Sequence, residues 1–373
     1  MIAERYTISA EHRDSNNLSA RILEEAAKRN TPELTDFAAS PIHRDWKKDQ
    51  EYVDSKKKNF ETTMDYHAKA LEHVIQLGIA QGRLLNNPRS TDYLTEPIWV
   101  TDYDDIANRV DTAATVHTSP ELKNDGNEEE ITFGIDLTTN PNTDVILLKI
   151  LKGTNDRHAN YPVGFSKIKY YRDADQKLGK RIMIPHYCVG MDGRSIDEIL
   201  DNTYADRNTG NITINHKADV VPSFKMLYEI NAQNQLYKAI LKRRLEANPP
   251  IGGPDERKAL EDLETLDLIY SKELERFTKA ACAVLYIFEP LDAKGLANRL
   301  AKDDDKKDQT FVRIVQITHK LRDRVLTESD PNWIEKMKDG AIKKEREKHS
   351  APREQRYGQS ANNVAGMINR RAV

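Results

Sequence analysis

The stretch from Asp102 to Asp192 constrains the fold more than any other part of this sequence. Its apolar residues follow the two-residue period of β-strands, whereas most of the sequence on either side is helical in period or polar. The alternation is clearest at residues 131–139, where apolar residues share one face and Asp136 lies on the other. We therefore predict an α/β core with a mixed sheet flanked by helices, followed by a mostly helical C-terminal region.

The same periods predict the individual elements of the core. Strands are expected at residues 97–100, 110–118, 131–139, 168–171 and 182–189. Helices are expected at residues 57–85, 143–152 and 195–202. Residues 119–130 join two of the strands and contain an Asp-Gly pair, which is typical of a hairpin loop.

The C-terminal region is predicted to be helical at residues 224–247, 254–288 and 309–326. In the second of these helices an apolar stripe runs from Leu260 to Leu285. A stripe of this kind is typical of a packing face. It can serve the core of the chain itself, a homodimer seam or a protein partner.

Four segments are expected along the chain. Residues 1–56 are predicted to be a flexible, partly helical arm, residues 57–203 the α/β core, residues 204–342 the helical region, and residues 343–373 a basic flexible tail. The tail carries eight Lys and Arg residues against three Glu residues. Such a segment is either a solvated tail or an arm that touches nucleic acid, since basic side chains displace counterions from phosphates.

Composition excludes several classes of protein. A net charge of -3 argues against a protein that coats nucleic acid through bulk charge, although a local basic groove remains compatible with it. The two cysteines, Cys188 and Cys282, lie far apart, so a structural zinc site is not indicated. No apolar run reaches the roughly 18 residues of a membrane span, and the N-terminus does not resemble a secretory signal. We therefore expect a cytoplasmic protein with no membrane contact.

Asp111 and Asp136 are the carboxylates best placed for a metal site. Hydrolysis of a phosphodiester needs an activated water and neutralised phosphate oxygens, and Mg²⁺ held by one or two carboxylates supplies both. The two residues belong to neighbouring predicted strands, which would hold their side chains side by side. Each also has a plainer interpretation: Asp111 as a cap at the start of its strand, and Asp136 as a solvent-facing residue of a half-exposed strand.

The order of these elements, with Asp111 and Asp136-Leu-Thr138 in it, resembles the PD-(D/E)xK superfamily of restriction-endonuclease-like nucleases. The resemblance covers about residues 57–203. It implies a restriction-endonuclease-like mixed sheet and Mg²⁺-dependent cleavage of nucleic acid. Residues 104–111, 133–138 and 183–192 also resemble those of a group of uncharacterised bacterial hypothetical proteins, and that second resemblance implies no activity.

The resemblance implies roles for particular residues. Asp111 and Asp136 match the two metal-binding acidic residues of the superfamily, but Thr138 stands where its lysine is expected. Some members take the lysine from the next helix, which makes Lys149 the candidate here and Lys152 the reserve. The early helical glutamate of the superfamily corresponds to Glu72. Both lysines could instead be ordinary solvated helix residues.

Further polar residues lie around this motif. Asn108 and Arg109 are predicted to position Asp111 or to bind a phosphate of the substrate, or else to be surface loop residues. His117 shares a strand face with Asp111 and is expected to be structural or exposed. Asp102, Asp104 and Asp105 are expected in a loop, where one could add an oxygen ligand.

Two functions remain open from the sequence. The first is a Mg²⁺-dependent nuclease that acts on nucleic acid phosphodiesters. The second is a catalytically degenerate nuclease fold that binds a protein or nucleic acid without cleaving it, an alternative that Thr138 favours.

Overall fold

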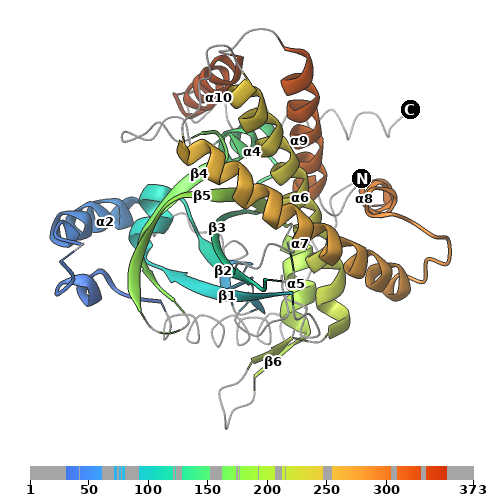
Figure 1. The fold of residues 1–373 in the computed structure, drawn as a ribbon, viewed down its shortest axis with the longest axis horizontal. Helices are drawn as coiled ribbons and strands as arrows, with labels where there is room; N and C mark the ends of the chain where they lie inside the picture. The colour runs from blue at the N-terminus through green and yellow to red at the C-terminus, as the bar shows by residue number, and fades with distance from the viewer. Residues whose placement is uncertain are drawn as a thin grey trace, which may run out of the picture.

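The structure of the protein is a computed structural model. The described residues are 31–41, 43–60, 71–73, 75–76, 78–79, 92–120, 122, 128–151, 162–173, 175, 177–191, 193–205, 212–214, 216–246, 254–303, 309–328 and 333–350. They form an α/β core with a mixed sheet, followed by a mostly helical C-terminal part, as the sequence predicts (Figure 1).

Five strands form the central sheet, which closes on itself. They are β1 (Tyr93–Val100), β2 (Thr112–Thr118), β3 (Glu129–Thr138), β4 (Phe165–Arg172) and β5 (Leu178–Gly190). Their order around the sheet is β1-β2-β3-β5-β4, and β4 pairs back with β1 at Trp99 and Val100. The sheet is mixed because β3 and β5 run parallel while the other pairs are antiparallel.

The predicted strands are confirmed in position, and all except the second are longer than expected. The second begins at Thr112 rather than residue 110. The alternation in β3 would also suit a strand with one solvated face, but residues 131–138 are buried on both faces. The reason is that the sheet closes on one side and carries helices on the other, where the Phe133 ring contacts that of Tyr270.

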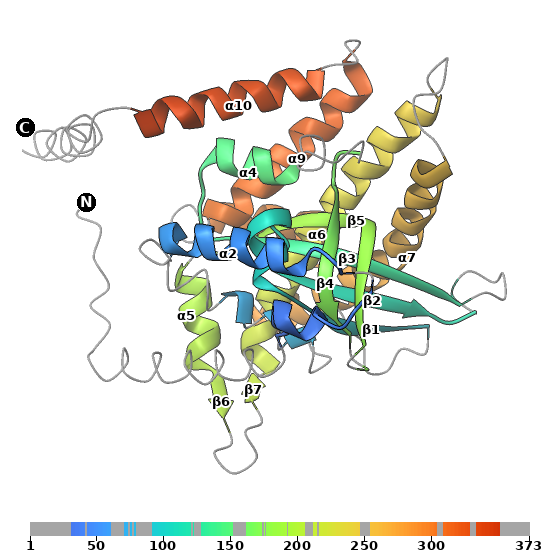
Figure 2. The ribbon, with the colours of Figure 1, turned by 90° about the vertical axis from the view of Figure 1, so that its left-hand side faces the viewer.

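The helices α4 (Thr143–Ile150) and α5 (Gly193–Asp201) flank the sheet at the predicted positions. The Asn142 side chain caps α4 by accepting a hydrogen bond from the Asp144 N–H at 2.9 Å. α4 ends at Ile150, so the predicted end at residue 152 was wrong. A short hairpin of β6 (Thr203–Ala205) and β7 (Ile212–Ile214), which the sequence did not indicate, projects beyond α5 (Figure 2).

Five helices make up the described C-terminal part. They are α6 (His216–Glu246), α7 (Pro254–Val284), α8 (Ala293–Asp303), α9 (Gln309–Thr327) and α10 (Trp333–Ser350). α6 packs against α7, α9 and β5, and α10 packs against α4 (Figures 1 and 2). No helix in the described ranges is long and apolar enough to cross a membrane.

Two predicted helix ends in this part were wrong. α6 begins at His216 rather than residue 224 and contains Pro222, because the buried Val220 and Phe224 hold both sides of the proline in the core. α7 ends at Val284 rather than residue 288, because Tyr286 adopts the left-handed conformation with φ of 54°.

The apolar stripe of α7 is a packing face within the chain. Its residues Leu263, Leu266, Leu274 and Phe277 are buried in the main core with α6. Leu285, at the end of the stripe, is 38% exposed. The stripe therefore serves the core of the chain, and a homodimer or protein partner at this region stays a prediction.

Two helices cross the predicted segment boundaries near the ends of the described chain. α2 (Trp46–Phe60) crosses the expected boundary at residue 56 and lies on the far side of the sheet from α7 (Figure 1). Residues 34–37 form the 3-10 helix η1 beside it. α10 likewise runs through the expected start of the flexible tail at residue 343 and reaches Ser350. Residues 1–30 and 351–373 lie outside the described residues.

Only parts of the helix predicted at residues 57–85 are described. Within residues 71–79, all seven described positions are helical. The predicted apolar residues Leu71, Ile75 and Ile79 are buried there, which agrees with the three- and four-residue spacing.

Replacing Gly164 by alanine is expected to destabilise the protein by about 2–4 kcal/mol. Gly164 has φ of 81°, and a Cβ there would lie 2.4 Å from the Tyr237 ring. Urea unfolding measures the loss. Gly340→Ala is the matched control, because nothing lies within 4 Å of its Cβ and alanine favours the interior of α10. Equal stability of the two variants would contradict this account.

Candidate functional site

The start of β2, the end of β3 and α4 meet at one place. Asp111 lies immediately before β2, and its N–H donates to the Ile135 carbonyl at 2.9 Å. Its Oδ2 accepts a hydrogen bond from the Leu137 N–H at 2.5 Å. The Asp111 carboxylate therefore reaches across to β3 beside the residue that follows Asp136.

Lys149 of α4 reaches the same place. Its Nζ forms an ion pair and hydrogen bond with Asp136 Oδ1 and donates to the Leu137 carbonyl at 2.7 Å. The Asp136 side chain is 2% exposed and that of Lys149 is 17% exposed. The plain interpretations of these two residues, a solvent-facing aspartate and a solvated lysine, are therefore wrong.

The charges of these three side chains affect the pKa values of Asp111 and Lys149. Burial raises the pKa of Asp111 well above its usual range, the Asp136 and Asp105 carboxylates raise it further, and Lys149 opposes them. Burial alone would lower the pKa of Lys149, but the Asp136 and Asp111 carboxylates outweigh it and raise that pKa above its usual range. The two carboxylates therefore favour the charged form of Lys149, an ammonium that can neutralise negative charge.

Asp104 anchors the loop that leads to Asp111. It lies at the start of the π-helix η2 (Asp104–Asn108) and is fully buried. Its carboxylate accepts hydrogen bonds from the N–H groups of Lys169 at 2.7 Å and Tyr170 at 2.8 Å. The Asn108 amide donates to it at 2.6 Å. Asp104 thus joins the loop to β4 instead of acting as an exposed loop residue.

We expect Asp104 to make stability fall as the pH rises through the weakly acidic range. Burial raises the pKa of Asp104 from 3.8 to about 6, although the hydrogen bonds that its carboxylate accepts lower that pKa. The folded state therefore binds the Asp104 proton more tightly than the unfolded state does. The stability that this proton contributes is fully present below pH 3.8 and is lost as the pH rises to about 6. The loss is on the order of 3 kcal/mol, at 1.36 kcal/mol per pH unit.

Unfolding free energies of the native protein and Asp104→Asn, measured from pH 4 to pH 7, check this expectation. The variant cannot titrate at this position, so its curve should lack the descending component between pH 4 and about 6. Parallel curves for the two proteins would contradict the assignment.

Asn108 and Arg109, predicted to touch substrate, have different surroundings. Asn108 is buried and holds Asp104, so the structure gives its amide a structural contact. Arg109 has an exposed side chain and a left-handed backbone with φ of 50°. Its carbonyl accepts a hydrogen bond from His186 Nε2 at 3.1 Å. The substrate contacts of both residues stay predictions.

Gln76 supports Asp111 from the helical residues 71–79. Its Nε2 donates to the Asp111 carbonyl at 3.0 Å. Glu72 lies one helical turn before Gln76 and is partly exposed. Glu72 was named as the counterpart of the superfamily's early helical glutamate, and that correspondence stays a prediction. Gln76 makes the hydrogen bond to the Asp111 carbonyl.

The rear of the site is held by α6, which the sequence did not connect with it. Cys188 of β5 lies opposite Asp136 in the parallel register. The Gln233 side chain accepts from the Cys188 N–H at 2.8 Å and donates to its carbonyl at 2.7 Å. Tyr237 donates its hydroxyl to the Ile150 carbonyl at the end of α4, at 3.0 Å. α6 thereby fixes both β5 and the helix that carries Lys149.

The other residues singled out in the sequence have different surroundings. His117 lies at the far end of β2, where its Nε2 is 3.2 Å from Glu96 Oε2. Thr138 ends β3, and its hydroxyl accepts from the Asn140 N–H at 3.2 Å. Asp102 precedes η2 and is partly exposed. Lys152 lies outside the described residues.

The donor set fits a magnesium ion better than a softer metal. Within the described ranges, no group of three or more His, Cys, Asp or Glu side chains could hold an ion by itself. Mg²⁺ is commonly held by only one or two carboxylates and keeps several waters. Asp111 Oδ1 accepts no hydrogen bond from the described residues, and Asp136 lies beside it. An ion there would compete with the Lys149 ammonium for Asp136.

No protein-family model, curated protein or solved structure matches the chain. The interpretation of this site therefore depends on its geometry.

Proposed function

We propose that this protein is a Mg²⁺-dependent nuclease that hydrolyses nucleic acid phosphodiesters, with Asp111 and Asp136 as metal-binding residues. The observation that supports this most is the convergence of Asp111, Asp136 and Lys149 from two strands and a helix. Two neighbouring carboxylates with one ammonium suit a phosphate centre, where negative charge must be neutralised.

Each residue would have a separate task. Mg²⁺, when bound to Asp111 and Asp136, would neutralise phosphate oxygens and make a bound water more acidic. The Lys149 ammonium would stabilise the charge that develops on the phosphate. Gln76 and Gln233 would keep the start of β2 and the register of β5 in place, and neither needs to touch substrate.

The second candidate function is a catalytically degenerate nuclease fold that binds a protein or nucleic acid. Two contacts favour it: Asp111 Oδ2 already accepts the Leu137 N–H, and Lys149 already neutralises Asp136. In that case the ion pair would stabilise the core and would never give way to a metal ion.

Cleavage of labelled single- and double-stranded DNA and RNA, with Mg²⁺ or Mn²⁺, tests the proposal. The native protein should cleave at least one of these substrates, and a chelator or Asp136→Asn should abolish the cleavage. No cleavage by the native protein, with nucleic acid binding unchanged by Asp136→Asn, would leave the degenerate fold as the function.

Replacing Arg109 by glycine is expected to weaken nucleic acid binding without harming the fold. Glycine adopts a φ of 50° without strain, so the change removes the exposed Arg109 side chain and keeps the backbone conformation. If that group binds a phosphate, the slope of log affinity against log salt should fall by about one. Tyr286→Gly, at another exposed left-handed position, is the control and should bind as the native protein does. An unchanged salt slope in Arg109→Gly would remove Arg109 from the binding surface.

A further inference from the structure

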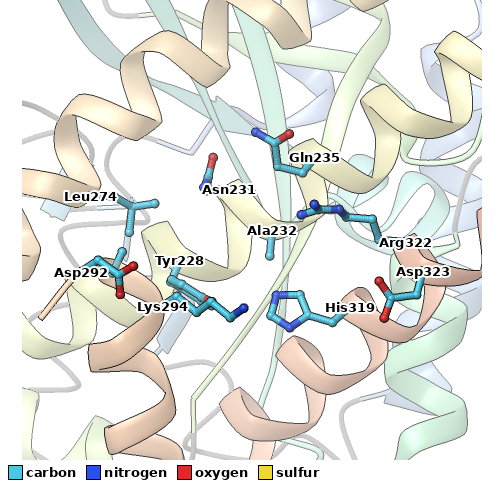
Figure 3. A pocket seen from close by; sticks show the side chains of 11 residues that line it. Tyr228, Asn231, Ala232, Gln235, Leu274, Asp292, Lys294, His319, Arg322 and Asp323 are labelled. Atoms are coloured by element: carbon cyan, nitrogen blue, oxygen red, sulfur yellow. The ribbon is translucent and has the colours of Figure 1, made fainter. Parts of the chain in front are cut away.

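A cavity of about 500 Å³ lies between α6, α7, α8 and α9, and none of Asp111, Asp136 or Lys149 lines it. Polar side chains from three of these helices face it, among them Asn231 of α6 (Figure 3). Its volume is in the range of small-molecule sites, which run from about 300 to 1,000 Å³.

Three nitrogen-bearing side chains point toward one another in this cavity. Lys294 of α8 and His319 and Arg322 of α9 converge in Figure 3. Their electrostatic effects agree with this view. Burial lowers the pKa of His319, and both Arg322 and Lys294 lower it further, whereas Asp323 opposes them. The imidazole therefore lies within the field of both cations.

The Arg322 guanidinium and the Lys294 ammonium are both available to a ligand. Arg322 and Lys294 make no ion pair or hydrogen bond with other residues of the described part of the chain. Asp292 and Asp323 also line the cavity, at its two sides in Figure 3. Asp292 caps α8 by accepting the Gly295 N–H at 2.6 Å, so its carboxylate is already engaged. The cavity thus offers an anion the Lys294 ammonium and the Arg322 guanidinium, with the Asp292 and Asp323 carboxylates at its two sides.

Asn231 adds a requirement for a hydrogen-bond donor. Its Oδ1 is buried and accepts no hydrogen bond within the described ranges. A buried acceptor without a donor destabilises the folded protein. A ligand that carried a hydroxyl or amino group as well as an anionic group would satisfy both features of the cavity.

We propose that this cavity binds a small phosphate ester. Arg322, Lys294 and His319 would hold the phosphate, and a hydroxyl or amino group of the ligand would donate to Asn231. Arg322 is suited to this because a guanidinium can hold two phosphate oxygens at once. The proposal does not depend on cleavage at Asp111 and Asp136.

Isothermal titration with adenosine monophosphate, glucose 6-phosphate and inorganic phosphate tests it. At least one ester should bind more tightly than inorganic phosphate, and Arg322→Gln should weaken that binding by about tenfold or more. Lys320→Gln is the matched control, because it removes an exposed charge of α9 outside the cavity. Absence of ester binding at millimolar concentration, or equal losses in both variants, would overturn the proposal.

The titration of His319, followed by NMR with and without sulfate, gives an independent reading. Sulfate stays doubly charged across neutral pH, so its own titration does not interfere. An anion held by Arg322 and Lys294 should raise the pKa of His319 from its lowered value, despite the nearby Asp292, Asp323 and Tyr228. Anion binding at this place would be contradicted if sulfate left the titration midpoint of His319 unchanged. It would also be contradicted if sulfate shifted that midpoint by the same amount in the native protein and in Arg322→Gln.

Discussion

Replacing Lys149 by methionine is expected to destabilise the protein by about 3–5 kcal/mol. It should also lower phosphodiester cleavage by about 10²–10³-fold. The change leaves the buried Asp136 and the neighbouring Asp111 without the ammonium that neutralises them. Urea unfolding and a cleavage assay on the same preparation measure the two effects.

Lys242→Met is the matched control for this variant. Lys242 pairs with Glu264 at 2.9 Å, but both side chains are 48% exposed. Its loss should therefore cost no more than about 1 kcal/mol. If Lys149→Met were as stable as this control, the Lys149–Asp136 pair would not be the buried contact described above.

Magnesium should restore part of the stability of Lys149→Met. With the ammonium gone, an ion would meet no competitor at Asp136. Binding to the folded state alone contributes about 2.7 kcal/mol at a hundredfold excess over Kd. A melting temperature that does not respond to Mg²⁺, in a variant that is destabilised as expected, would favour the degenerate fold.

The second large effect is expected from a double-variant cycle. Asp136→Asn alone should cost about 3–5 kcal/mol, because it leaves the Lys149 ammonium buried without its partner. Asp136→Asn combined with Lys149→Met should cost less than the two single losses together, by about 0.5–3 kcal/mol. Denaturant midpoints of the four proteins provide the cycle. Additive losses would show that Asp136 and Lys149 do not interact.

Much of the core could be predicted because its strands and helices have clear periods. The strand at residues 131–139 and the helix that Asn142 caps lie where their patterns place them. The closure of the sheet could not be predicted. β1 and β4 lie far apart in the sequence, and they pair over only a short stretch. Because the closure was not visible, the burial of residues 131–138 on both faces of β3 could not be predicted from their alternating pattern.

The charged members of the candidate site were visible in the sequence, whereas their supports were not. Asp136 was conspicuous because aspartate is rare in the middle of a strand. Gln76, Gln233 and Tyr237 carry no such signal, since each contacts a backbone group of a distant element. The role of Asp104 was missed because an aspartate in a polar loop ordinarily faces solvent, and here it is buried by η2 and β4.

Titration with Mn²⁺, followed by electron paramagnetic resonance, tests the central claim most directly. The native protein should bind Mn²⁺ at a saturable site from which Mg²⁺ displaces it, and Asp111→Asn and Asp136→Asn should each weaken that binding by at least about tenfold. Absence of a saturable site in the native protein, or binding by both variants as tight as binding by the native protein, would contradict a metal centre formed by Asp111 and Asp136.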